Sequence, residues 1–194
     1  VAGNFNMTNV TELFNSLVEL GQHPKELADT VTVMEKIGHF LDDEVTDLYQ
    51  ECKNNGLSKR EASPVIAEKL DIAKILKRAS KGWDGGYAMA GLLGHGDSFV
   101  FRDPAGIRPA YFYEDEEIVV VASERPVIQT TFNVPFEKVQ ELLPGNALII
   151  KKTEPFRNRK LSLQASKKLV PLNASISLAV VMPKFIRKEK NWEN

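Results

Sequence analysis

The apolar pattern of this 194-residue chain changes its period once, at the stretch Gly82-Trp83-Asp84-Gly85-Gly86. Before this stretch, apolar residues recur at the spacing of helices. After it, they form short runs separated by turns rich in Gly, Pro, Asn and Asp. A parallel sheet requires strands that alternate with helices along the chain, whereas here the helices come first and the strands follow. The pattern therefore predicts an α+β fold with antiparallel hairpins.

Capping residues divide the first half into helices. Asn9 and Glu12 have the spacing of a capping box. Ser63-Pro64 has the form of an N-cap followed by a first helical residue, so we expect the helix that starts at Ser58 to be short and a new one to begin at Pro64. The expected helices cover about residues 9–20, 26–54, a short piece from 58, 64–70 and 72–80.

The second half reads as hairpins. Gly94-His95-Gly96-Asp97 is a hairpin-type turn, and the Pro- and Gly-rich run 102–109 is a rigid loop. The expected strands cover about residues 87–93, 98–101, 110–113, 117–122 and 147–151, with a short helix over 124–130.

Composition excludes several classes of protein. Lys and Arg number 25 against 26 Asp and Glu, and this balance gives no electrostatic footprint for nucleic acid or an anionic membrane. The single cysteine, Cys52, allows neither an internal disulfide nor a site with several thiolates, and the three histidines lack ligand spacing. No run approaches 18 apolar residues. We therefore expect no metal site, no nucleic-acid partner and no membrane partner.

Two stretches are unusual. Asn4-Phe5-Asn6-Met7-Thr8-Asn9 places three asparagines at alternate positions before a helix, which a turn and an N-cap would explain. Arg102-Asp103-Pro104-Ala105-Gly106-Ile107-Arg108-Pro109 is followed by Val121-Ala122-Ser123-Glu124. A tight loop with Arg102 paired to Asp103 would account for the first of these two motifs.

These motifs resemble the class II glutamine amidotransferase domain, and most closely its form in the amidophosphoribosyltransferase family. The stretch from Trp83 to Tyr87 is similar to a strand start of that family. The resemblance covers residues 1–152 and implies an αββα sandwich of the N-terminal-nucleophile hydrolase type. Family members make phosphoribosylamine from glutamine and phosphoribosyl pyrophosphate in purine synthesis. Their N-terminal Cys releases ammonia from glutamine, with its own α-amine as the general base.

The resemblance also implies what this chain lacks. Val1 corresponds to the middle of the family's domain, so residues 1–152 would be its C-terminal portion, without the nucleophile, the upstream strands or the Arg that holds the glutamine carboxylate. Such an internal fragment would be an incomplete sandwich, inactive alone and prone to associate through exposed edges. Its expected partners are glutamine and the remainder of a cytoplasmic, homo-oligomeric enzyme. No cofactor is expected here, since Mg²⁺ would belong to the absent phosphoribosyltransferase domain.

The resemblance assigns three site residues. The family's Asn-Gly-Asn motif matches Asn4-Phe5-Asn6, so the Asn4 side chain and the Phe5 backbone N–H would form the oxyanion hole. Phe5 departs from the family Gly, which puts a positive φ or a close substrate approach in doubt. Asp29 matches the carboxylate that pairs with the α-amino group of glutamine. A helix N-cap is the alternative role for Asp29.

Residues 153–194 depart from the family. Reading the codons of Lys168-Leu169-Val170-Pro171 one base earlier permits Ala-Cys-Ser. The same shift, continued to Asn194, permits a stretch similar to the family's passage into its phosphoribosyltransferase domain. We therefore expect a non-native, frameshifted and weakly structured tail. The encoding DNA would test this expectation.

Two other functions stay open at this stage. One is a sibling amidotransferase, such as glucosamine-phosphate synthase or asparagine synthetase, against which the form of the 102–109 loop argues. The other is a non-catalytic binding or interaction module that keeps the fold without the chemistry.

Overall fold

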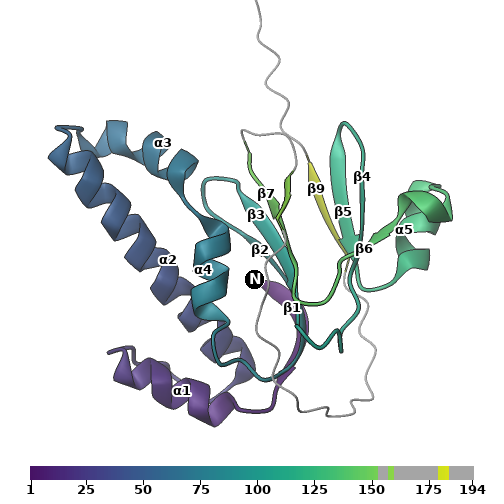
Figure 1. The fold of residues 1–194 in the computed structure, drawn as a ribbon, viewed down its shortest axis with the longest axis horizontal. Coiled ribbons are helices and arrows are strands. Elements are labelled where there is room, and N and C mark those ends of the chain that lie inside the picture. The colour runs from purple at the N-terminus through teal and green to yellow at the C-terminus, as the bar shows by residue number, and fades with distance from the viewer. Residues whose placement is uncertain (153–156, 160–178, 184–194) are drawn as a thin grey trace, which may run out of the picture.

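The computed structural model describes residues 1–152, 157–159 and 179–183, and it confirms the predicted α+β class (Figure 1). Both sheets are antiparallel, with strand orders β1-β2-β3-β7-β8 and β6-β4-β5-β9. The elements are β1 (Ala2–Met7), α1 (Val10–Glu19), α2 (Asp29–Asn54), α3 (Lys59–Lys69), α4 (Ile72–Ala79), β2 (Gly85–Leu92), β3 (Ser98–Arg102), β4 (Tyr111–Glu114), β5 (Ile118–Ala122), α5 (Arg125–Phe132), the 3-10 turn η1 (Phe136–Lys138), β6 (Gln140–Glu141), β7 (Ala147–Ile150), β8 (Arg157–Arg159) and β9 (Ala179–Pro183).

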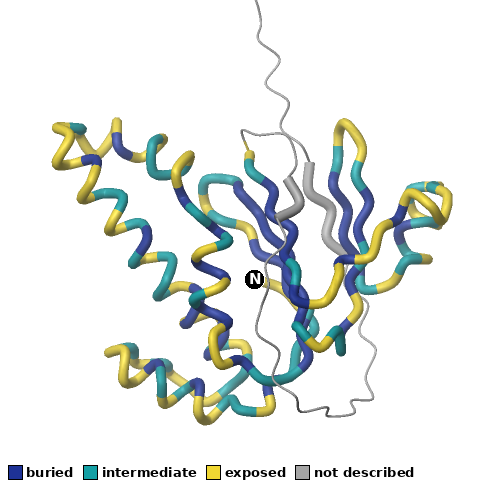
Figure 2. The backbone as a smooth tube through the Cα atoms, in the orientation of Figure 1, coloured by how far each residue is buried: buried dark blue, intermediate teal, exposed yellow. Residues whose placement is uncertain are grey.

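Three apolar clusters hold the elements in four layers, in the order helices, sheet, sheet, helix (Figures 1 and 2). The first cluster joins α1, α2 and α4 to one face of the β1–β2–β3–β7 sheet. The second fills the space between the sheets and includes Val100, Phe112 and Leu148. The third packs Ile128 of α5 against Val120 on the outer face of the second sheet.

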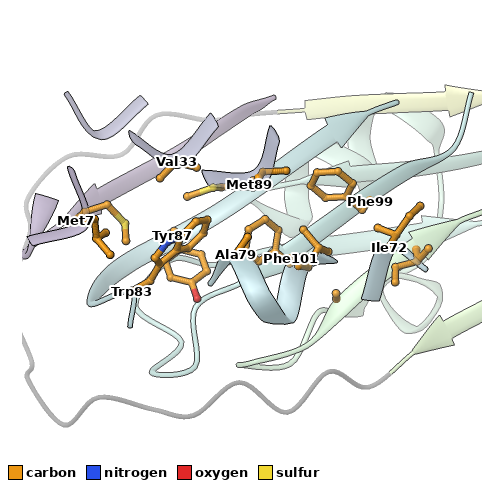
Figure 3. Close-up of a cluster of buried hydrophobic side chains, with 14 residues drawn as sticks. Met7, Val33, Ile72, Ala79, Trp83, Tyr87, Met89, Phe99 and Phe101 are labelled. Carbon is orange, nitrogen blue, oxygen red and sulfur yellow. The ribbon is translucent and has the colours of Figure 1, made fainter. Parts of the chain in front are cut away.

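Three aromatic rings pack together near residues 82–86, where the helices end and the strands begin. Trp83, Tyr87 and Phe101 pack with ring centroids 5.4 to 5.8 Å apart (Figure 3). Each is at most 5% exposed. Burial raises the pKa of the Tyr87 phenol, and the nearby Asp103 carboxylate raises it further. Such a buried cluster fixes residues 82–86, the switch segment between helices and strands, against the helix layer.

Most of the predicted helices are confirmed, and one boundary is wrong. Ser63-Pro64 starts no new helix, because α3 runs unbroken through Pro64. Ser58 and Glu61 form a reciprocal capping box that begins this helix five residues earlier. A proline in the second turn forfeits one backbone hydrogen bond, and the strong cap upstream makes that loss tolerable.

The capping box predicted at Asn9 is absent. Asn9 does precede α1, but its side chain makes no capping hydrogen bond there. Instead its Nδ2 donates to the Gly82 carbonyl at 2.9 Å, and its Oδ1 accepts from the Asp84 N–H at 3.2 Å. The side chain thus ties the start of α1 to the switch segment, a long-range role that local spacing does not reveal.

The stretch from Asn4 to Asn9, which a turn and an N-cap would explain, is a strand up to Met7 and a turn only at Thr8 and Asn9. β1 pairs with β2 along its whole length, from Ala2 opposite Ala90 to Met7 opposite Gly85. Phe5 and Met7 lie on the helix side and pack into the first cluster. Alternate burial of these two apolar residues outweighs the turn preference of the asparagines between them.

The sequence pattern assigns residues 153–194 no place in either sheet, whereas the structure pairs 157–159 with β7 and 179–183 with β5. The other residues of this segment lie outside the described part of the chain. The expectation that the segment is frameshifted stays a prediction. Among the described residues, the structure contains no helix with the length and apolar character needed to cross a bilayer.

Candidate binding site at the outer edge of β1

β1 is the outermost strand of its sheet, so half of its backbone groups point away from β2. The Thr8 N–H donates to the Asp84 carbonyl at 2.9 Å, which makes Thr8 and Asp84 a hydrogen-bonded pair. Such pairs alternate along an antiparallel ladder. Asn4 and Asn6 therefore direct their backbone groups toward β2, while Phe5 directs its N–H toward the outer edge.

A hydrogen bond to Asp29 shows the same outward direction for the N–H of Met7, two residues after Phe5. Its Oδ2 accepts a hydrogen bond from the Met7 N–H at 2.8 Å. Asp29 is the first residue of α2, and Ala28 is the N-cap residue, so Asp29 does not cap the helix. Residues two apart in a strand are about 7 Å apart. A carboxylate therefore lies roughly one strand repeat from the outward N–H of Phe5.

Asn4 and Asn6 project from the opposite face of the sheet. Asn4 is paired with Ala88, which packs against the cluster between the two sheets, and Asn6 is paired with Gly86. Both asparagines are half-buried. Neither side chain makes a hydrogen bond to another residue of the described part of the chain.

The backbone at position 5 accommodates Phe, where the similar family has Gly, without a positive φ. Among the described residues, Asn133 is the only one other than glycine with a positive φ, so Phe5 has ordinary strand geometry. Its side chain packs against the first apolar cluster, on the helix side of the sheet. A glycine at this position would lose that packing while presenting the same backbone N–H.

The loop over residues 102–109 is built around a fully buried carboxylate. Asp103 is 0% exposed. Its Oδ1 accepts from the Ile107 N–H at 2.8 Å, and its Oδ2 accepts from the N–H groups of Arg108 at 3.0 Å and Tyr87 at 3.3 Å. These contacts close the loop on itself and fasten it to β2.

The predicted pair between Arg102 and Asp103 is wrong. Neighbouring residues at the end of a strand point to opposite faces, so their side chains diverge. The Arg102 guanidinium instead donates to the Glu141 carboxylate at 2.6 Å. It also donates to three backbone carbonyl oxygens, those of Arg108, Leu142 and Gly106.

The two unusual stretches of the sequence meet at Gly86. This glycine lies opposite Asn6 in the strand register, and a Cβ at Gly86 would lie 2.6 Å from Cγ2 of Ile107. A side chain here would displace the loop from the sheet. In the sequence, only the two adjacent glycines at 85 and 86 indicate this contact. The periodicity of apolar residues does not explain why glycine is needed there.

A second polar cluster, missed by the sequence analysis, lies at the opposite end of β2. Asp97 is 2% exposed and forms ion pairs with His95 at 3.0 Å and with Lys151 at 2.9 Å. Lys151 also donates to the Leu70 carbonyl, which follows α3, at 2.9 Å. Desolvation alone would raise the pKa of Asp97, but hydrogen bonds from the Lys152 N–H, Lys151 and His95 and the charge of Lys151 lower it. This cluster fastens the β2–β3 turn to the helix layer.

The part of the chain that the structure describes contains no candidate metal site. No three of its His, Cys, Asp and Glu side chains are grouped in a way that could hold an ion. Cys52 is 3% exposed and lies near the C-terminal end of α2. It is separated from Asp29 by 23 helical residues, or about 35 Å of helix.

The arrangement of helices and antiparallel sheets matches part of two solved structures. One is a glutamine phosphoribosylpyrophosphate amidotransferase from B. subtilis in complex with ADP and GMP, with a TM-score of 0.53 and 22% identity over 84% of this chain and 29% of that one. The other is described as the allosteric regulatory enzyme of purine biosynthesis, with a TM-score of 0.53 and 21% identity over 84% of this chain and 28% of that one. At this identity the likeness shows the fold.

Two curated proteins are similar to the chain in sequence over part of its length. The chain is 39% identical over 95 residues to amidophosphoribosyltransferase of Saccharomyces cerevisiae, which covers 46% of this chain and 17% of the yeast protein. It is 38% identical over 87 residues to the Lachancea kluyveri protein of the same name, which covers 42% of this chain and 16% of that protein. No family model matches the chain. The chain is thus related to amidophosphoribosyltransferase, a protein of purine biosynthesis, over a partial region that spans about a sixth of these curated relatives.

Proposed function

We propose that this chain is the glutamine-binding portion of the amidotransferase domain of an amidophosphoribosyltransferase, with an N-terminal-nucleophile hydrolase fold. The observation that carries the proposal is the hydrogen bond from the Met7 N–H to Asp29. It brings a carboxylate to the same strand edge that presents the outward N–H of Phe5. The four layers of helices and sheets agree with this fold.

The proposed roles follow from charge and direction. The free oxygen of Asp29 pairs with the ammonium group of glutamine, which orients the substrate along β1. The Phe5 N–H and the Asn4 carboxamide donate to the carbonyl oxygen of the side-chain amide. The side chain of glutamine spans a length comparable to the repeat of about 7 Å between Met7 and Phe5.

Binding without hydrolysis is the proposed activity of this chain alone. A thiolate nucleophile must reach the amide carbon, and Cys52 is buried about 35 Å along the helix from Asp29. The proposed partners are glutamine and the remaining parts of the enzyme, and no cofactor takes part in binding at this edge. A non-catalytic binding module with the same fold is the second candidate, and the remote, buried Cys52 is compatible with both candidates.

Calorimetric titration with L-glutamine tests the proposal. Asp29→Asn keeps an acceptor for the Met7 N–H but removes the charge, so we expect glutamine affinity to fall at least tenfold. Asp42→Asn, an exposed position on the same helix, is the matched control and should leave the affinity unchanged. The proposal fails if the parent chain shows no binding or if both variants bind equally well.

A further inference from the structure

We propose that a buried site between α2 and the turn at residues 80–83 binds a small inorganic anion of the size of chloride. Its side chains are those of Thr32, Lys36, Ser80 and Trp83. The inference goes beyond the proposed function and does not depend on it, because none of these four residues has a role in holding glutamine.

The position of Lys36 defines the site. Lys36 is 6% exposed, and its Nζ donates to the Lys81 carbonyl at 2.8 Å. Lys81 lies inside a turn that the hydrogen bond from the Trp83 N–H to the Ser80 carbonyl closes at 3.0 Å. The ammonium group therefore reaches a turn whose first and last residues are Ser80 and Trp83. Thr32 lies one helical turn before Lys36, on the same face of α2.

The charge of the site is unbalanced. A buried ammonium group is normally paired with a carboxylate, yet Lys36 forms no ion pair with any described residue. Asp43 and Glu44, the carboxylates of α2 that face α4, pair with other cations. Burial lowers the pKa of Lys36, and the positive charge of Lys81 lowers it further. An anion would supply the negative charge that this site lacks.

The hydrogen-bonding groups of the site are donors without acceptors. Thr32 Oγ1, Ser80 Oγ and Trp83 Nε1 have no hydrogen-bond partner among the described residues, although these residues are only 1%, 8% and 5% exposed. Buried polar groups are normally hydrogen-bonded, and an indole N–H can only donate. A water molecule accepts such hydrogen bonds but does not balance the ammonium charge. An anion does both.

The surroundings limit the size and charge of the anion. Trp83 and Val33, the neighbour of Thr32, belong to the first apolar cluster, and the Trp83 ring is held there by Tyr87 and Phe101 (Figure 3). A closely packed apolar wall favours a compact anion that loses its hydration shell readily. One buried ammonium group balances one negative charge, so we infer a monovalent ion.

Thermal unfolding of the full chain in two salts tests the inference. Sodium chloride is compared with sodium gluconate at equal ionic strength, since gluconate is too large for the site. We expect the midpoint to rise with chloride concentration beyond its value in gluconate, because binding to the folded chain stabilises it. The line width of the chloride nuclear magnetic resonance signal measures the binding directly.

Lys36→Met removes the ammonium group and keeps an unbranched side chain. This variant should lose the rise with chloride, and in gluconate it should be at least as stable as the parent chain, because a buried unpaired charge is gone. Trp83→Phe keeps an aromatic ring without the N–H donor, so it should weaken chloride binding about tenfold. Lys53→Met, at an exposed lysine of the same helix, is the matched control and should respond as the parent does.

Equal midpoints of the parent chain in the two salts overturn the inference, as they would if water alone satisfied the donors. A chloride response that Lys36→Met keeps overturns it as well. If Lys36→Met does not fold, the line width with Trp83→Phe decides, and binding as tight as that of the parent contradicts the site. In crystals soaked with bromide, anomalous scattering beside Lys36 and the 80–83 turn supports the site, whereas peaks only elsewhere refute it.

Discussion

The 102–109 loop and strand β1 both lie against Gly86 of β2, yet they use their polar groups in opposite ways. In the loop, the Asp103 carboxylate is fully buried and accepts three backbone hydrogen bonds. Along β1, Asn4 and Asn6 keep half-buried carboxamides without partners among the described residues. The more distinctive motif therefore maintains the fold, whereas a ligand-binding role for the less distinctive strand belongs to the proposed function.

The largest expected effect comes from Asp103→Ala. The substitution leaves three backbone N–H groups without their acceptor in a buried loop, at a cost of about 3 to 5 kcal/mol in the free energy of unfolding. Urea denaturation followed by circular dichroism measures this loss. Asp103→Asn keeps one acceptor oxygen and should lose less. A loss for Asp103→Ala no greater than that for the exposed Asp42→Ala would contradict the structural role of the loop.

An intermediate and pH-dependent effect is expected for Asp97. Because its pKa is lowered in the folded chain, its carboxylate contributes stability above the pKa of the unfolded chain, about 3.9, and loses it as the pH falls through the folded value. Asp97→Asn should therefore cost about 1 to 2 kcal/mol at pH 7. That difference should shrink in acid. Thermal melts of both proteins between pH 7 and pH 3 measure it, and a constant difference would exclude the ionic contribution.

The smallest effect on stability is expected for Asn4→Ala. A half-buried side chain without a hydrogen-bond partner should change the free energy of unfolding by no more than about 0.5 kcal/mol. The same urea series that tests Asp103 measures it. A loss above about 1 kcal/mol would show that β1 depends on its polar side chains as the loop does, and the contrast between the two regions would no longer hold.

Much of the fold follows from local patterns. The helices at 10–19 and 72–79 and the strands β2, β3, β4, β5 and β7 agree closely with the predicted ranges, because each has a clear period and a clear boundary. The short strand β6 and the strands β8 and β9 were not predicted. The errors arise where distant residues compete for the same groups. Asn9 is the N-cap residue of α1, but its side chain makes no capping hydrogen bond because it bonds to Gly82 and Asp84 instead. Arg102 pairs with Glu141, which is remote in sequence.

In the candidate site, too, the sequence predicts individual residues but not the long-range contacts between them. A resemblance in sequence predicted Asn4, Phe5 and Asp29 as site residues, but no spacing rule could have joined the first strand to the first residue of α2. The cluster of His95, Asp97 and Lys151 was missed for a similar reason, since the β2–β3 turn and the residue after β7 are brought together only by the sheet.

The sequence by itself determined the α+β class and the positions of most elements, because helix and strand periods are properties of neighbouring residues. Tertiary structure alone decided which backbone groups of β1 face outward, since that depends on its register with β2. It also decided that the Asp103 carboxylate serves the fold and that the Asp29 carboxylate lies at the open edge. The physical reason is that a polar group becomes available to a ligand only when folding leaves it without a partner inside the protein.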